Sequence, residues 1–422
     1  MRALLLIPAA AALLAQIPPD AASGLRRARE ILSERDRRLP DYTCVQTVDR
    51  RHYRRLNPHH PAATCDQVRS LSPADLVLTT TDRLRLELKV SKGVEIGSWP
   101  GSRFSEQSIF KLIGGGAYGT GMLGALIADV FVNGGAAYQY LGERTSGGAR
   151  LAAYAYQVPV AASHYQVKTR EDWTAVPFAG EFRLDSASFA LRHITEQAVR
   201  LPAETGACQV DTTVDYQKIP VGHGEFLLPR TSSIRTIMQD QTETQIDAAY
   251  TGCREYRGEA TIHFGESPLA GAAAPRETDV GPLPAGLRLS VALAAPIDTD
   301  IAAAGDIIRA RLRAPMVERG SKIVVPAGAA VEGRILRIEH WVPKPGRFTI
   351  DVMLEKIQVE NIWRPLYAKV VASASKGIWL SPIGMPPLVA RFPFVTNASR
   401  YRVPAGFRAD WMTVAPPMEE NK

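Results

Sequence analysis

The chain has 422 residues, of which 45% are hydrophobic and 22% charged, and its formal net charge is +7. This composition is ordinary for a folded protein, and about 400 mature residues are too many for one core, so we expect at least two domains. The apolar run at residues 3–14 is too short to span a bilayer, which needs about 20 residues, and this excludes a transmembrane helix there.

The first fifteen residues have the make-up of a secretory signal. Arg2 precedes the apolar run and Ala15 ends it, so we expect cleavage after Ala15. Gln16 stands where a lipid-bearing cysteine would be needed, and Arg26-Arg27 follow the run instead of preceding it. These features argue against a lipid anchor and against a twin-arginine signal. We expect a Sec-exported protein of the periplasm or exterior, with no nucleic-acid partner.

Four cysteines, an even number in an oxidising compartment, predict two disulfides. Their order along the chain favours Cys44–Cys65 and Cys208–Cys253. Four cysteines allow three pairings, so the connectivity stays open.

The positive charge is concentrated near the N-terminus. Between Gly24 and Arg55 there are ten arginines and five acids. Such a segment could contact anionic lipid headgroups or an acidic partner, so peripheral membrane contact through Arg26 to Arg55 is one interpretation. A solvated helix face followed by a basic strand is the alternative.

Apolar spacing predicts the elements in chain order. Leu25, Ala28, Ile31, Leu32 and Leu39 recur at helical intervals, and Pro40 ends that helix. Alternating patterns then predict hairpins with turns at Lys92-Gly93 and Gly147-Gly148. A glycine-rich segment at 114–124 leads into a second, apolar helix at 122–132. Further strands are predicted at 42–53, 165–169, 180–184, 189–197, 209–219, 225–238 and 243–264.

A second β region follows the first. Residues 265–282, rich in Ala, Gly and Pro, are predicted to form a linker. Beyond it the phrase Pro-Ala-Gly occurs at 284–286, 326–328 and 404–406, each time as a turn that starts a strand. The predicted fold is therefore mainly β. A curved antiparallel half-barrel sheet with two helices spans 24–264, a smaller β-barrel or sandwich domain spans 283–414, and a tail spans 415–422.

The layout of the first domain resembles the periplasmic lipoprotein-carrier and lipoprotein-sorting superfamily, which includes envelope-stress sensor domains. The resemblance lies in the opening helix that ends at Leu39-Pro40-Asp41-Tyr42, the hairpin at 84–99, the segment 178–185 and a strand that ends at Leu227-Leu228-Pro229. It implies a half-open sheet that wraps around helices and shelters an apolar cavity. The second domain, at 283–298 and 323–333, resembles the β-barrel of type IV secretion and conjugation channel proteins.

This resemblance implies a set of cavity residues on the hairpins and the second helix. They are Trp99, Phe104, Phe110, Met122, Leu126, Phe131, Tyr138, Tyr140 and Tyr154. A pocket for acyl chains is one interpretation, because each buried methylene contributes about 0.8 kcal/mol. A plain sheet core is the other.

Several motifs could carry other chemistry. The glycines at 114–124 fit a dinucleotide-binding fingerprint, but the antiparallel surroundings argue against it. His52, His59, His60 and Cys65 could bind zinc or copper, and Asp298, Asp300 and Asp306 could bind calcium. Ser163, His164 and Asp185 could form a triad only if the fold assembled them. We expect no metal and no cofactor.

The predicted function is that of an exported envelope protein without catalytic activity that binds a lipid, lipoprotein or acylated ligand. The second domain would dock on another envelope protein. Two alternatives stay open: a structural component of a secretion complex, and an envelope hydrolase of unrecognised type with a perturbed histidine or carboxylate in a cleft.

Overall fold

The computed structural model describes residues 17–56, 64–104, 109–113, 118–169, 172–198, 200–256, 281–317, 324–373 and 388–417. The predicted signal segment at 1–15 and most of the predicted linker therefore lie outside the described residues. The chain divides into two compact units, 1–39 with 121–232, and 40–120 with 233–422. The fold is mainly β, as predicted, and the strand pairs whose register is described are antiparallel, apart from one isolated parallel bridge between Leu84 and Ala304.

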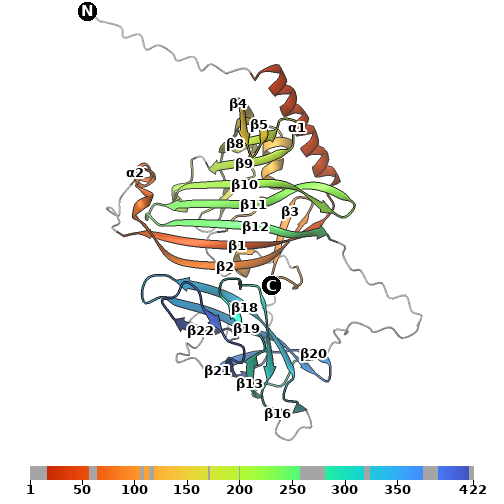
Figure 1. The fold of residues 1–422 in the computed structure, drawn as a ribbon, viewed down its shortest axis with the longest axis vertical. Coiled ribbons are helices and arrows are strands. Elements are labelled where there is room, and N and C mark those ends of the chain that lie inside the picture. Colours follow the sequence, from red (N-terminus) through yellow and green to blue (C-terminus); the bar gives the residue numbers. More distant parts are fainter. Residues whose placement is uncertain are drawn as a thin grey trace, which may run out of the picture. The chain divides into compact units, whose positions relative to one another are not determined.

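The first unit contains one long helix and a set of hairpins (Figure 1). Its elements are α1 (Pro19–Arg38), α4 (Ala125–Ile127), η2 (Ala128–Val132), β4 (Ala137–Ser146), β5 (Ala149–Val158), η3 (Val160–Ala162), β6 (Gln166–Lys168), β7 (Trp173–Ala175), β8 (Phe178–Asp185), β9 (Leu191–Ala198), η4 (Ala203–Thr205) and β10 (Ala207–Val221). β11 (Gly224–Met238) begins in this unit. Strands β4, β5, β8, β9 and β10 pair successively.

The first helix is confirmed but begins earlier than predicted, at Pro19, where proline suits the first helical position. Its buried stripe is Gly24, Leu25, Ala28, Leu32 and Arg35. The second predicted helix is shorter than expected. Residues 122–124 form turns, because glycines at 121 and 124 favour them, and the helix runs from Ala125 as one α-turn and then a π-helix.

The second unit opens with three adjacent strands. Its first elements are β1 (Tyr42–Arg55), α2 (Cys65–Ser70), η1 (Pro73–Asp75), β2 (Leu76–Ser91), β3 (Val94–Ser98), α3 (Ile109–Leu112) and β12 (Glu243–Glu255). β1 lies between β2 and β12, as Figure 1 shows. Lys92 and Gly93 both have positive φ, which gives the tight two-residue turn predicted between β2 and β3.

The predicted disulfide pairing is wrong. Cys44 on β1 is bonded to Cys253 on β12, because these strands are neighbours in the sheet although 209 residues separate the two cysteines. Cys65 and Cys208 are disulfide-bonded as well, and the chain has no free cysteine. Pairing by order along the chain fails because sheet neighbours here are distant in sequence.

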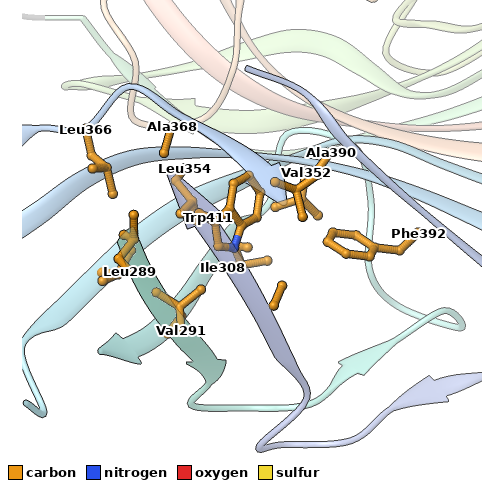
Figure 2. Packing of buried hydrophobic residues seen from close by; sticks show 14 of the residues in the cluster. Leu289, Val291, Ile308, Val352, Leu354, Leu366, Ala368, Ala390, Phe392 and Trp411 are labelled. Carbon is orange, nitrogen blue, oxygen red and sulfur yellow. The ribbon is translucent and has the colours of Figure 1, made fainter. Parts of the chain in front are cut away.

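The C-terminal part of this unit has its own apolar core. Its strands are β13 (Arg288–Leu293), β14 (Ile297–Asp298), β15 (Ile307–Leu312), β16 (Met316–Val317), β17 (Val324–Val325), β18 (Ala330–Trp341), β19 (Arg347–Val359), β20 (Ile362–Pro365), β21 (Ala368–Ser373), β22 (Ala390–Val395), β23 (Arg402–Val403) and β24 (Arg408–Thr413). Figure 2 shows Leu354, Ile308 and Val352 gathered around Trp411, which is 2% exposed.

The three Pro-Ala-Gly phrases behave as predicted. Gly286, Gly328 and Gly406 all have positive φ, and β13, β18 and β24 each begin two residues later. Proline sets the turn and glycine accepts the left-handed conformation, so a short phrase is enough to start a strand.

The C-terminal β region is joined to β2. Glu339, His340 and Trp341 of β18 pair with Asp82, Thr81 and Thr80. The Arg85 N–H donates to Ala304 O at 2.7 Å, and the Arg85 guanidinium forms an ion pair with Asp306. This ladder links the C-terminal strands to β2 through backbone as well as side chains.

Candidate ligand-binding groove

A groove of about 770 Å³ runs along α1 in the first unit. Its walls come from α1, the end of η2, the start of β9, and the turn between β10 and β11. The apolar lining residues include Ile31, Leu32, Phe131, Val132, Phe189, Leu191, Phe226 and Leu227. The volume is in the range of small-molecule sites, roughly 300–1,000 Å³.

Charged side chains surround this apolar floor. The cations are Arg26, Arg27, Arg29, Arg35, Arg37, Arg38 and Lys218, and the acids are Glu30, Glu34 and Glu225. Glu30 pairs with Arg27 at 3.0 Å, and Glu34 pairs with Arg37 at 3.2 Å. The rim therefore keeps a cationic excess after its own acids are paired.

Three contacts hold α1 in place beside the groove. Arg29 Nε donates to Phe131 O at 3.0 Å, and the Tyr154 hydroxyl donates to Ala21 O at 2.8 Å. A Cβ built on Gly24 would lie 3.3 Å from the Phe189 ring, so α1 packs closely against that side chain. These contacts fix α1 against its own unit, so that the helix forms one wall of the groove.

Arg35 is one of the lining residues that the sequence did not predict. It is 7% exposed, its Nε donates to Leu227 O at 3.0 Å, and its Nη2 donates to Leu123 O at 3.2 Å. Its Nη1 is buried without a hydrogen-bond partner among the described residues. The signal was available, since Arg35 continues the helical stripe of Ala28 and Leu32 at a spacing of three.

The structure brings four of the nine predicted cavity residues together. Phe131, Tyr138 and Tyr154 surround Phe182, with ring centroids 4.8, 6.1 and 5.1 Å away, and Tyr140 lies 5.2 Å from Tyr154. Met122 and Leu126 of the same unit are 5% and 6% exposed. Phe131 alone of the nine lines the groove.

The other three predicted residues belong to the second unit. Trp99 is 8% exposed, Phe104 packs edge-on against Tyr256, and Phe110 packs edge-on against Tyr118. A single cavity shared by all nine residues stays a prediction.

The first unit contains two buried acids, Asp129 of η2 and Glu196 of β9. Asp129 is 3% exposed and accepts from the His164 backbone N–H at 2.7 Å, and its other oxygen lies 2.6 Å from His164 Nδ1. Burial, and then the charge of Asp129, raise the pKa of Glu196 to about 8. Glu196 is a perturbed carboxylate of the kind that a hydrolase would use, but it does not line the groove.

The predicted triad does not assemble. The Ser163 hydroxyl donates to Val176 O at 2.7 Å, and His164 is engaged with Asp129. Asp185 instead accepts from the Ser188 N–H at 2.9 Å, and this backbone hydrogen bond is the main cause that lowers its pKa to about 2.

In both candidate metal sites, some of the predicted ligands are bound to other groups or lie outside the described residues. Cys65 is in a disulfide, and His59 and His60 lie outside the described residues. Asp306 is paired with Arg85, and Asp300 lies 3.6 Å from Arg400. Within the ranges that the structure describes, no group of three or more His, Cys, Asp or Glu side chains is arranged to hold a metal ion.

The glycine-rich segment does not sit in a dinucleotide-binding unit. β4 and β5, which follow it, are antiparallel, whereas the fingerprint requires a parallel βαβ unit. Residues 114–117 of the segment lie outside the described residues.

The basic segment is divided between the two units. Its helical arginines lie on α1, whereas Arg50 and Arg51 lie on β1 and are paired with Asp82 and Asp247. Arg55 donates to Ser72 O at 2.6 Å. A continuous membrane-contacting face from Arg26 to Arg55 stays a prediction. Among the described helices, none has the length and apolar character needed to cross a membrane.

Comparison with solved structures finds distant matches that cover part of this chain. A LolA superfamily protein from Nitrosomonas europaea matches with 12% identity and a TM-score of 0.23, over 56% of this chain and 94% of that chain. A putative outer membrane lipoprotein-sorting protein domain from Vibrio parahaemolyticus matches with 11% identity and a TM-score of 0.27, over 58% and 95%. A DUF1329 family protein from Desulfovibrio piger matches with 7% identity and a TM-score of 0.24, over 57% and 95%.

No protein-family model matches the sequence, and neither does any curated protein. The likeness of the second domain to secretion-channel barrels stays a prediction.

Proposed function

We propose that this chain is an exported envelope protein, without catalytic activity, that binds the acyl chain of a lipid or acylated ligand in the α1 groove. The observation that carries the proposal is the groove itself, about 770 Å³ with an apolar floor and a charged rim. Apolar walls favour a chain of methylenes, each contributing about 0.8 kcal/mol when buried, while the rim suits a polar head.

Export is supported by the cysteines. All four are disulfide-bonded, and disulfides persist in oxidising compartments such as the periplasm. An envelope-protein partner for the C-terminal β region stays a prediction.

The test places a charge on the groove floor. Ile31 is 36% exposed and Phe226 is half-buried, so Ile31→Asp and Phe226→Asp leave the fully buried core untouched. We expect each variant to bind N-phenyl-1-naphthylamine, a neutral fluorescent amphiphile, about tenfold more weakly, because a carboxylate must be desolvated by the probe.

The matched control is Val160→Asp. Val160 is 54% exposed in the same unit and does not line the groove. It should bind the probe as wild type does. Equal binding by all three variants and the wild type would contradict the proposal.

A further inference from the structure

We infer that Arg35 is the receptor for the acid group of an anionic lipid whose chain lies in the α1 groove. The inference rests on the proposed function. It narrows the class of ligand from any amphiphile to an amphiphile that has a carboxylate or phosphate beside its hydrocarbon chain. It begins from the place of Arg35 in the helix.

Arg35 stands where the helical pattern calls for an apolar residue. Leu25, Ala28 and Leu32 form the buried stripe of α1, and Arg35 is the next buried position on it. The other arginines on the groove rim are exposed or half-buried. The helix therefore buries one guanidinium while it leaves its neighbours in solvent.

The protein compensates this buried charge only in part. Two carbonyl oxygens, of Leu227 and Leu123, accept from Nε and Nη2, and the C-terminal end of α1 favours a cation. Nη1 is buried and has no hydrogen-bond partner among the described residues. A buried charge is stable only when it is paired and hydrogen-bonded, so an acceptor is missing.

Three acids line the groove, Glu30, Glu34 and Glu225, and none of them forms an ion pair with Arg35 in the described structure. Glu30 and Glu34 are paired with the exposed Arg27 and Arg37, and Arg35 forms no ion pair within the described part of the chain. The missing acceptor must therefore come from outside the protein.

The shape of the site indicates the ligand. A guanidinium fork fits a carboxylate or phosphate through two parallel hydrogen bonds. Leu32 lies one turn from Arg35, and Phe131, Leu191 and Leu227 continue the apolar floor. A ligand with an acid group at Arg35 and a hydrocarbon chain along this floor would match both the guanidinium and the apolar surface. A free anion matches only the guanidinium, and a neutral lipid matches only the apolar surface.

The test compares myristate, myristyl alcohol and inorganic phosphate on the full chain by calorimetry. Wild type should bind myristate at least about tenfold more tightly than the alcohol, as a charge-assisted hydrogen bond provides. Arg35→Leu should bind myristate and myristyl alcohol with equal affinity, and its affinity for the alcohol should be retained. Arg150→Leu, which removes the same charge from an exposed position of the same unit outside the groove, should keep the preference.

Arg35→Lys is a second variant that tests the same role if Arg35→Leu does not fold. It keeps the charge but loses the fork, so the preference for myristate should shrink while circular dichroism stays native.

Each contrary outcome has its own meaning. Equal wild-type binding of myristate and the alcohol, or equal losses in Arg35→Leu and Arg150→Leu, overturns the role of Arg35 and leaves the proposed groove unaffected. If equimolar phosphate displaces myristate, Arg35 binds free anions, and the proposal of an anionic lipid is wrong. No binding of either long-chain compound overturns the proposed function itself.

Discussion

Asp129 and His164 are joined twice, through the His164 backbone N–H at 2.7 Å and its ring Nδ1 at 2.6 Å. Asn133 Nδ2 adds a third hydrogen bond to the same carboxylate at 3.1 Å. The negative charge so held, together with burial, makes ionisation of the nearby Glu196 unfavourable.

We predict that Glu196→Gln stabilises the protein above about pH 5. The folded pKa of about 8 exceeds the ordinary value of 4.5, so the folded protein retains a proton that the unfolded chain has lost. Stability due to Glu196 is therefore full below pH 4.5 and declines until pH 8, by up to about 1.4 kcal/mol per pH unit.

Urea unfolding at pH 4, 6 and 8 measures this effect. The Gln variant should equal wild type at pH 4 and exceed it increasingly at pH 6 and 8. A constant difference across the three pH values would show that Glu196 has the same pKa in the folded and the unfolded protein, and would contradict the prediction.

The close approach of Gly305 to β2 gives a second prediction. A Cβ on Gly305 would lie 2.2 Å from Arg85 O and 2.8 Å from the Trp99 ring. Gly305→Ala should therefore weaken the junction between β2 and the C-terminal strands. Gly142 has nearly the same φ, +103° against +102°, but open space around its Cβ.

Gly142→Ala is thus the control for backbone strain alone. We expect Gly305→Ala to cost about 1–3 kcal/mol more in the free energy of unfolding, because the added methyl overpacks a backbone contact. Equal costs in the two variants would mean that β2 and Gly305 are not in contact.

The disulfide pairing gives a third prediction. Peptide mapping without reduction should recover a Cys44–Cys253 linked peptide and no Cys44–Cys65 peptide. Cys44→Ser with Cys253→Ser should lower stability by about 5 kcal/mol according to loop entropy, because the bond closes a loop of 209 residues. Recovery of the Cys44–Cys65 peptide would contradict the β1–β12 pairing.

Local features of the fold were predictable from the sequence. The turns at Lys92-Gly93 and Gly147-Gly148 and the three Pro-Ala-Gly phrases are set by residues adjacent in the chain, and all have the expected positive φ. A predicted strand boundary is wrong where a turn occupies the first residues of the predicted strand. β9 begins at Leu191 and not at Phe189, because Phe189 has φ +56° in a turn that Asp185 caps.

Long-range features were not predictable in the same way. The Cys44–Cys253 bond depends on which strands become neighbours, which no short segment encodes. The groove joins five separate segments between Arg26 and Leu227, and Phe131 is its only residue from the predicted cavity set. Arg35 was missed because only apolar residues were followed along the helical stripe.

Photo-crosslinking tests the central claim most directly. A diazirine-labelled fatty acid, irradiated with the full chain and mapped by peptide mass spectrometry, should label peptides from α1 and from the start of β11, which wall the groove. Labelling confined to peptides that contain Trp99, Phe104 and Phe110, or spread over the whole surface, would contradict a binding site in the α1 groove.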